Sequence, residues 1–186
     1  MYDTSDLRKG LKINVDGNPY VVVEAQFVKP GKGAAFTRTR MKNLITGLIL
    51  ERSWRSGEKL EPADVEEATM QFSFREGDTY HFMDTTTFET IPVHADHVGD
   101  AKDYLADNLI VSVTVYNGRP IAVTPPNFVE IQIADAEPGV RGDTASNVTK
   151  AATLVTGASI QVPMFVNKGD VIRIDTRTGE YLERIR

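Results

Sequence analysis

The sequence predicts an all-β fold made of three small β-barrel domains. Stretches such as YVVVEAQFV and LIVSVTVY alternate apolar and polar residues or run β-branched residues together, and a period of two is the period of strands. Turn sequences separate these stretches, among them DGNP, KPGKG, REGD, YNGRP, NKGD and RTGE. Helical patterns are scarce. Many short strands between frequent turns are typical of small barrels.

The first strand pair lies in the N-terminal third. Tyr20–Lys29 and Ala34–Asn43 read as two antiparallel strands joined by a Pro-Gly turn. Proline presets φ for the second position of a type II turn, and glycine supplies the positive φ of the third position. We therefore expect Pro30 and Gly31 to form a type II turn, with Lys32 at its apex and with Gly33 leaving open space beside that lysine.

Two short helices and a second hairpin follow. PADVEEA, which begins at Pro62, predicts one helical turn, and HADHVGDAKDYLADN, which begins at His94, predicts a short helix capped near Asp100. Asn117-Gly118 between two β-rich runs predicts a tight β-hairpin. The last strands are predicted in NFVEIQIAD and DVIRIDT.

Composition and proline mark two domain boundaries. The sequence turns acidic around Glu61, and Pro125-Pro126 interrupts any sheet. The predicted domains are residues 1–63, 64–126 and 127–186. Barrels of this size are marginal alone, so we expect packing between them to contribute to stability.

Charge is distributed unevenly in this acidic chain, whose formal net charge is −5. Residues 1–60 contain 11 Lys and Arg against 6 Asp and Glu, residues 61–130 contain 3 against 13, and residues 131–186 contain 7 of each. This asymmetry indicates that the N-terminal third contacts a polyanion. The acidic middle would discourage indiscriminate binding to nucleic acid.

The cations of the first hairpin are arranged to follow a phosphate backbone. Arg38, Arg40 and Lys42 alternate and so share one face of their strand, while Lys29 lies at the base of the turn and Lys32 at its tip. A row of cations beside a slim tip suits contact with successive RNA phosphates. The alternative is that both the tip and the row are ordinary solvated surface.

The remaining residues give little sign of catalysis. The chain has no cysteine, which excludes disulfides and thiolate metal sites. His94 and His97 lie near Asp96 and Asp100, as a metal site on a helix would require, but we favour a solvated helix start. No nucleophilic side chain lies at a sequence spacing from a general base that would indicate a catalytic pair. We therefore expect a protein that is not an enzyme, with no metal and no cofactor.

The sequence also leads to expectations about the cellular location and the oligomeric state of the protein. The N-terminus lacks the apolar run of a signal peptide, and no apolar segment is long enough to span a bilayer. We expect a cytoplasmic monomer without membrane contact.

Two other classes of function remain open at this point. A general single-stranded RNA-binding protein would need aromatic side chains beside cations, and Phe72, Phe74, Phe128 and Phe165 appear scattered and without basic partners. A hydrolase would have to use the carboxylates of the acidic middle.

Three blocks of the sequence resemble the bacterial elongation factor P family. They are FVKPGKGAAFTRTRMKNLITG at Phe27, FMDTTTFE at Phe82, and the segment from EPGVRGDTASNVTKAATLVTG to GEYLERI. The resemblance implies an SH3-like (KOW-type) barrel followed by two OB-fold barrels. It also implies a factor that binds the ribosome between the P and E sites and relieves stalling at consecutive prolines. Its partners would be ribosomal RNA and the P-site peptidyl-tRNA.

The resemblance also assigns roles to particular residues. Lys32 would be the tip residue that reaches toward the peptidyl-transferase centre, and in many members that residue is modified by a separate enzyme. Gly142, Asp143 and Thr144 would form a loop near the small subunit and the E-site codon. Tyr181 and Arg184 match the end of the family's C-terminal domain and are further candidates for RNA contact.

Overall fold

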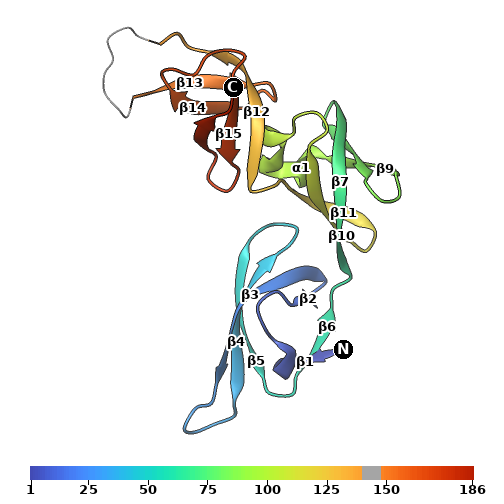
Figure 1. Cartoon of the computed structure of the whole chain (residues 1–186). Coiled ribbons are helices and arrows are strands. Elements are labelled where there is room, and N and C mark those ends of the chain that lie inside the picture. Colours follow the sequence, from blue (N-terminus) through green and yellow to red (C-terminus); the bar gives the residue numbers. More distant parts are fainter. Residues whose placement is uncertain (140–147) are drawn as a thin grey trace. The chain divides into compact units, whose positions relative to one another are not determined.

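The computed structural model describes residues 1–139 and 148–186 and contains three β-sheets (Figure 1). The chain forms two compact units, one of residues 1–67 with 114–122 and the other of residues 68–113 with 123–186. The all-β prediction with three β-sheet domains is confirmed.

The first sheet has the strand order β1-β6-β2-β3-β4-β5. Its strands are β1 (Tyr2–Asp3), β2 (Lys12–Val15), β3 (Asn18–Val28), β4 (Phe36–Asn43), β5 (Ile49–Arg55) and β6 (Lys59–Pro62), and a 3-10 turn, η1 (Thr4–Asp6), follows β1. Alternate residues point inward and bury Leu11, Ile13, Val15, Val22, Met41, Trp54 and Leu60 in one core. This barrel core anchors the β3–β4 hairpin.

The second sheet has the order β11-β10-β7-β8-β9. Its strands are β7 (Val65–Glu76), β8 (Thr79–Asp84), β9 (Thr90–His94), β10 (Ile110–Tyr116) and β11 (Arg119–Thr124), and α1 (Ala95–Val98) and the 3-10 helix η2 (Gly99–Tyr104) lie between β9 and β10. The Asn-Gly hairpin prediction is confirmed: φ is 49° at Asn117 and 78° at Gly118, and positive values at both central residues are the mark of a type I′ turn.

The third sheet has the order β14-β13-β12-β15-β16. Its strands are β12 (Phe128–Ala136), β13 (Thr149–Leu154), β14 (Ser159–Pro163), β15 (Val171–Asp175) and β16 (Glu180–Arg184). Tyr104 and Leu109, which come from the segment between β9 and β10, pack against its core. The Thr156 hydroxyl also donates a hydrogen bond to the Asp103 carbonyl at 2.7 Å, so the second and third sheets are joined in one unit.

Both helix predictions need correction in detail. The segment that begins at Pro62 is not helical: Pro62 ends β6, which pairs with both β1 and β2, and β7 already begins at Val65. Sheet pairing there satisfies the backbone and overrides the helical preference of Ala and Glu. The second helical segment exists, but it begins at Ala95, and His94 Nδ1 caps it by accepting from the Asp96 N–H at 3.1 Å.

Candidate functional site

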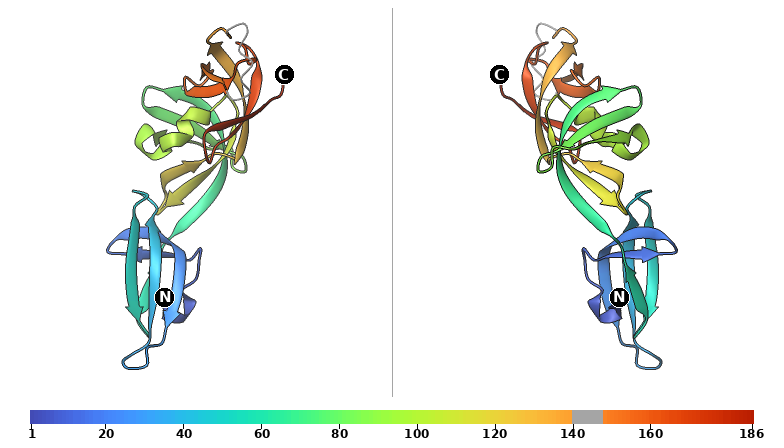
Figure 2. Two further views of the ribbon diagram at one scale, coloured as in Figure 1. Left: turned by 90° about the vertical axis from the view of Figure 1, so that its left-hand side faces the viewer. Right: turned by 90° about the vertical axis from the view of Figure 1, so that its right-hand side faces the viewer.

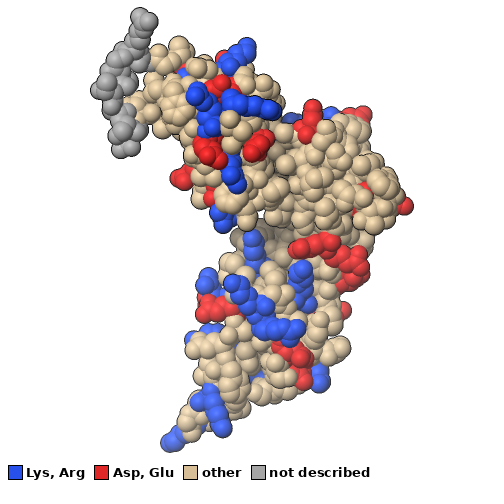
Figure 3. Space-filling model, in the orientation of Figure 1, with Lys and Arg blue, Asp and Glu red and all other residues tan. Residues whose placement is uncertain are grey.

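The end of the β3–β4 hairpin, residues 26–38, forms a finger on the first sheet. β3 and β4 pair as far as Val28 and Phe36. In both views of Figure 2 the loop that closes them extends past the neighbouring strands of its sheet. Lys29, Lys32 and Gly33 in this loop are exposed, and Figure 3 shows basic side chains at its end. The finger therefore presents the Lys32 ammonium on a narrow support.

The backbone of the finger tip corrects the predicted type II turn. The positive φ falls on Gly33, at 102°, and Gly31 is not among the residues with positive φ. A Cβ added at either glycine would have no atom within 4 Å. The residue with positive φ thus follows Lys32 rather than preceding it. Glycine is favoured at position 33 by this backbone conformation and not by lack of space for a side chain.

Buried threonines fix the base of the finger in the barrel. Thr39 is fully buried; its hydroxyl donates to the Arg52 carbonyl at 2.9 Å and accepts from the Trp54 indole N–H at 3.0 Å. Thr37, two residues nearer the tip, is also buried. These contacts join β4 to β5 and set the direction in which the finger leaves the sheet.

The outer row, defined as Arg38, Arg40 and Lys42, lies on one exposed face of β4, as predicted. One cation of the outer row has acidic partners, however. Arg40 lies 3.6 Å from Glu24 on β3 and 3.5 Å from Glu51 on β5, because the strand register places both acids opposite it. Arg38 and Lys42 form no ion pair with any described residue, so they are the members best able to attract phosphates.

Sequence reasoning overlooked Arg55. Arg55 pairs with Phe36 across the β4–β5 ladder, and with Arg38 and Trp54 it lines a hollow of about 400 Å³ beside the finger. The alternation in ERSWRS, which places Arg55 outward while Trp54 is buried, was the available signal.

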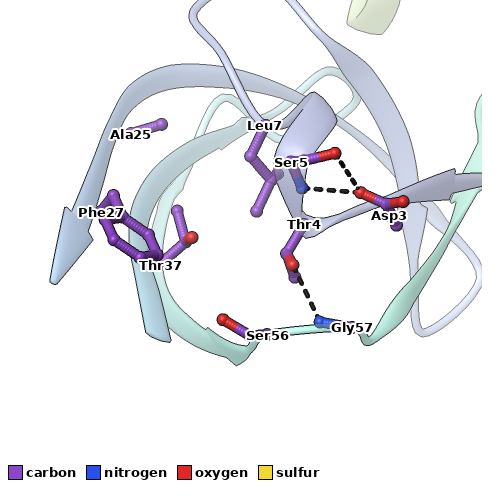
Figure 4. A pocket seen from close by; sticks show the side chains of 9 residues that line it. All are labelled: Asp3, Thr4, Ser5, Leu7, Ala25, Phe27, Thr37, Ser56 and Gly57. Atoms are coloured by element: carbon purple, nitrogen blue, oxygen red, sulfur yellow. Dashed lines mark hydrogen bonds between the residues drawn. The ribbon is translucent and has the colours of Figure 1, made fainter. Parts of the chain in front are cut away.

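A second hollow, of about 620 Å³, lies on the inward side of the finger base. In Figure 4, Phe27 and Thr37 face it from one side and the turn from Asp3 to Ser5 faces it from the other. The Gly57 N–H donates to the Thr4 hydroxyl at 3.1 Å, and the Ser5 N–H donates to the Asp3 carboxylate at 2.7 Å. The Ser5 hydroxyl also donates to the Asp3 carboxylate, and this bond, with the one from the Ser5 N–H, lowers the pKa of Asp3. This lining has no cation, so it does not suit phosphate.

The C-terminal candidates lie in the other unit. Tyr181 is half-buried against the core of the third sheet, and burial raises the pKa of its hydroxyl. The Arg184 guanidinium lies 5.0 Å from the Phe165 ring and 3.6 Å from Asp170. Gly142, Asp143 and Thr144 lie outside the described residues.

The expectation that the four phenylalanines lack basic partners is wrong for two of them. Arg173 and Arg177 lie 5.0 and 5.2 Å from the Phe128 ring, and Arg184 covers Phe165. Phe72 is buried in the core, whereas Phe74 is half-exposed. The partners were missed because they lie far from these rings in the sequence and meet them only through strand pairing.

Metal and membrane features are absent from the described part of the chain. Residues 1–139 and 148–186 contain no cluster of three or more His, Asp or Glu side chains placed to hold a metal ion. Among the same residues, no helix is both long and apolar enough to cross a membrane.

Three family models match successive parts of the chain. They are the elongation factor P KOW-like domain over residues 3–60, the elongation factor P OB domain over residues 65–123 and the elongation factor P C-terminal domain over residues 129–184. The fold is thus that of a multi-barrel translation factor, with a KOW-like barrel that carries the finger and an OB barrel after it.

Relatives of similar length match the whole chain. Elongation factor P of Moorella thermoacetica is 53% identical over 184 residues, which is 99% of this chain and 100% of the relative. Elongation factor P of Caldanaerobacter subterraneus is 51% identical over 185 residues, with both chains covered completely. The chain therefore belongs to the elongation factor P family, a family of translation elongation factors.

Solved structures share part of the fold. A eukaryotic translation initiation factor 5A from Methanococcus jannaschii superimposes with a TM-score of 0.55 at 21% identity, over 67% of this chain and 91% of that one. An eIF-5A family protein from Naegleria fowleri gives a TM-score of 0.54 at 16% identity, over 66% and 96%.

Proposed function

We propose that this protein binds the ribosome between the P and E sites and stimulates peptide-bond formation where consecutive prolines stall it. In this proposal Lys32 positions the end of the P-site peptidyl-tRNA, and the ribosome carries out the chemistry. The protein itself acts in the cytoplasm as a monomeric binding factor, not as an enzyme.

The observation that carries the proposal is the placement of Lys32. Its ammonium lies at the tip of a finger whose base is fixed by the buried Thr39 and Trp54, and it is flanked by two glycines that add no side chain. A lysine is a compact charge with three donors. It can contact phosphate and 2′-hydroxyl oxygens, which are the groups that RNA offers at such a site.

The physical benefit is orientation. Proline reacts slowly because its ring restricts the approach of the attacking nitrogen. A contact that orders the end of the peptidyl-tRNA before the reaction reduces the entropy that is lost on reaching the transition state. One well-placed donor can therefore change the rate while adding little to the total binding free energy.

The RNA contacts would extend from the finger to the C-terminal sheet. Arg38 and Lys42 lack acid partners among the described residues, and they suit the tRNA backbone beside Lys32. On the family resemblance, we assign Gly142, Asp143 and Thr144 to contacts near the small subunit and the E-site codon, and Tyr181 and Arg184 to further contacts with RNA.

Lys32 is also the proposed site of modification by a separate enzyme. An extended side chain would reach farther from the same backbone position. The intact mass of the protein from its native cell, compared with the mass of a Lys32→Arg variant, tests this: an added mass absent from the variant is expected, and an unmodified wild-type mass would contradict it. We further propose domain boundaries at 1–63, 64–126 and 127–186.

The test of function is synthesis of a Pro-Pro-Pro reporter relative to a proline-free reporter in a reconstituted system, together with ribosome affinity. Lys32→Ala should abolish rescue of the proline reporter and leave affinity nearly unchanged. Lys29→Ala, which removes a cation from the base of the same exposed loop, is the matched control and should keep most of the rescue. Full rescue by Lys32→Ala would refute the proposal.

A further inference from the structure

The inward hollow, defined as the hollow of about 620 Å³ at the base of the finger, has the lining of a site for a flat, polar-edged group. Apart from Gly57, the lining consists of three apolar side chains, four hydroxyl side chains and the Asp3 carboxylate. Its volume is within the range of small-molecule pockets. We propose that this hollow receives one unpaired nucleobase of a single-stranded RNA segment, which stacks on Phe27 and hydrogen-bonds through its edge to Thr37 and Asp3.

Phe27 and Thr37 lie on the same face of the hairpin. They are paired across the β3–β4 ladder, and side chains directly opposite each other in a ladder share a face. Thr37 is buried between Phe36 and the exposed Arg38, so this face is the inward one, and Figure 4 shows both side chains at one side of the hollow. The Phe27 ring is nevertheless 65% exposed. A ring that is anchored in a ladder and open to solvent is a platform on which a base can stack.

The Thr37 hydroxyl provides a second, independent observation. An exposed ring alone would indicate little, because single apolar residues are common on protein surfaces. Thr37 is only 5% exposed, yet its hydroxyl forms no hydrogen bond with a described residue, whereas the hydroxyl of Thr39 forms two. Hydroxyls that are this well covered usually have a partner. Because Thr37 lines the hollow, a ligand there can supply the missing partner.

The opposite side of the hollow is preformed and offers an acceptor. The Ser5 N–H and hydroxyl both donate to Oδ1 of Asp3, and the Gly57 N–H donates to the Thr4 hydroxyl. Oδ2 of Asp3 accepts no hydrogen bond from a described residue, so this oxygen is available. A carboxylate accepts hydrogen bonds from the amino group of a base such as cytosine. The hollow should therefore prefer bases with an exocyclic amino group over uracil.

The charges around the hollow favour RNA over a peptide as its occupant. Residues 1–60 contain 11 Lys and Arg against 6 Asp and Glu, and Lys29 and Lys32 belong to the same finger as Phe27. These cations attract a polyanion and repel a basic peptide. The hollow itself has no cation, so it suits the base and leaves the phosphates outside. This inference rests on the proposed function, from which it takes the RNA partner, and it adds a base contact at the base of the finger.

The test compares oligocytidylate with oligouridylate, each fluorescein-labelled and about 8 nucleotides long, within the range of known site sizes. Binding to the intact protein is followed by fluorescence anisotropy at several salt concentrations. The two pyrimidines have rings of the same size, but only cytosine has an amino group. Wild type should therefore bind oligocytidylate at least about fivefold more tightly.

Phe27 has its own variants and control. Phe27→Ala should weaken binding of oligocytidylate about tenfold. The slope of log affinity against log salt should stay unchanged, because no charge is removed. Phe27→Tyr keeps a stacking ring and should bind as wild type. Phe88→Ala removes another exposed ring, which does not line the hollow, and should also bind as wild type.

The two polar groups are tested separately. Thr37→Val replaces the hydroxyl by a methyl group of similar shape and should weaken binding about fivefold, whereas Thr37→Ser should restore it. Asp3→Ser keeps a residue that can cap the following turn but removes the carboxylate. This variant should lose most of the preference for oligocytidylate over oligouridylate.

Wild-type-like binding by Phe27→Ala and Thr37→Val would overturn the proposal, as would an equal loss in Phe88→Ala or no binding by wild type. A basic amphipathic peptide of Lys and Leu is the competing probe. If its binding depends on Phe27 and Asp3 while RNA binding does not, the hollow is a peptide site and the proposal is wrong. The titration uses neither ribosomes nor the proline reporter, so its failure is distinguishable from failure of the proposed function.

Discussion

Replacing the glycines on either side of Lys32 separates backbone geometry from crowding. Gly31 and Gly33 are both exposed, and an added Cβ would have no atom within 4 Å at either position. They differ in φ, which is 102° at Gly33 and not positive at Gly31. Gly31→Val is therefore the matched control for Gly33→Val.

The magnitude follows from the backbone strain at position 33. A β-branched residue held at such a φ costs about 1–3 kcal/mol, which is roughly a 5- to 150-fold change in an equilibrium constant. The loop escapes this strain by adopting other conformations, so the fraction of molecules with Lys32 in its native position falls by that factor. The apparent activity of the tip falls with this fraction.

The assay is again the proline reporter, with ribosome affinity and urea unfolding measured on the same variants. Gly33→Val should lose at least fivefold of the rescue rate, Gly31→Val should stay close to wild type, and both should unfold at the wild-type urea concentration because the loop lies outside the core. If Gly31→Val loses as much rescue as Gly33→Val, the argument from φ is wrong.

The remaining predictions concern the outer row, the base of the finger and acid stability. Neutralising all three cations of the outer row should weaken ribosome binding and flatten its salt dependence, whereas unchanged affinity would make the row ordinary surface. Thr39→Val should lower the free energy of unfolding by about 1–3 kcal/mol, because it leaves the buried Trp54 indole N–H without its acceptor. Thr37 is also buried, but its side chain forms no hydrogen bond with a described residue. Thr37→Val should therefore lower the free energy of unfolding by less than Thr39→Val in the same urea titration. The fold lowers the pKa of Asp175, chiefly through a hydrogen bond from the Arg177 side chain, so the ionised carboxylate stabilises the folded state above the ordinary pKa of 3.8, and this contribution is lost as the pH falls through the folded pKa. Asp175→Asn should therefore lower the urea midpoint at neutral pH, and its difference from wild type should disappear in acid; a difference that persists there would refute the assignment.

Local patterns were enough to predict β3, β4, β10, β12 and β15 and the outward face of β4. The alternation that exposes Arg38 and buries Thr39 is a property of one strand, and the Asn117-Gly118 turn needs only its own two residues. The segment after Pro62 was mispredicted because the helical preference of its Ala and Glu residues is outweighed by the strands that it joins, β6 and β7.

Features that depend on strand register or on the conformation of a whole loop could not be predicted from the sequence. Either glycine of the tip can adopt a positive φ, and which one does depends on the conformation of the whole loop that closes the Val28–Phe36 pair. The acids that flank Arg40 come from two other strands and reach it through a register that includes a bulge in β3.

The finger would reconcile the acidic net charge of the chain with the RNA partner that we propose. Val22, which is 1% exposed, is a residue of β3 fixed in the core, and Val28 at the end of β3 lies about 20 Å farther along the strand at roughly 3.3 Å per residue. At physiological ionic strength, charges are screened beyond about 8 Å. Acids around the core therefore contribute little to the potential at Lys32, although they dominate the net charge of −5. On the proposed function, local placement of a few cations, rather than overall charge, would let this chain contact RNA at chosen points and be repelled elsewhere.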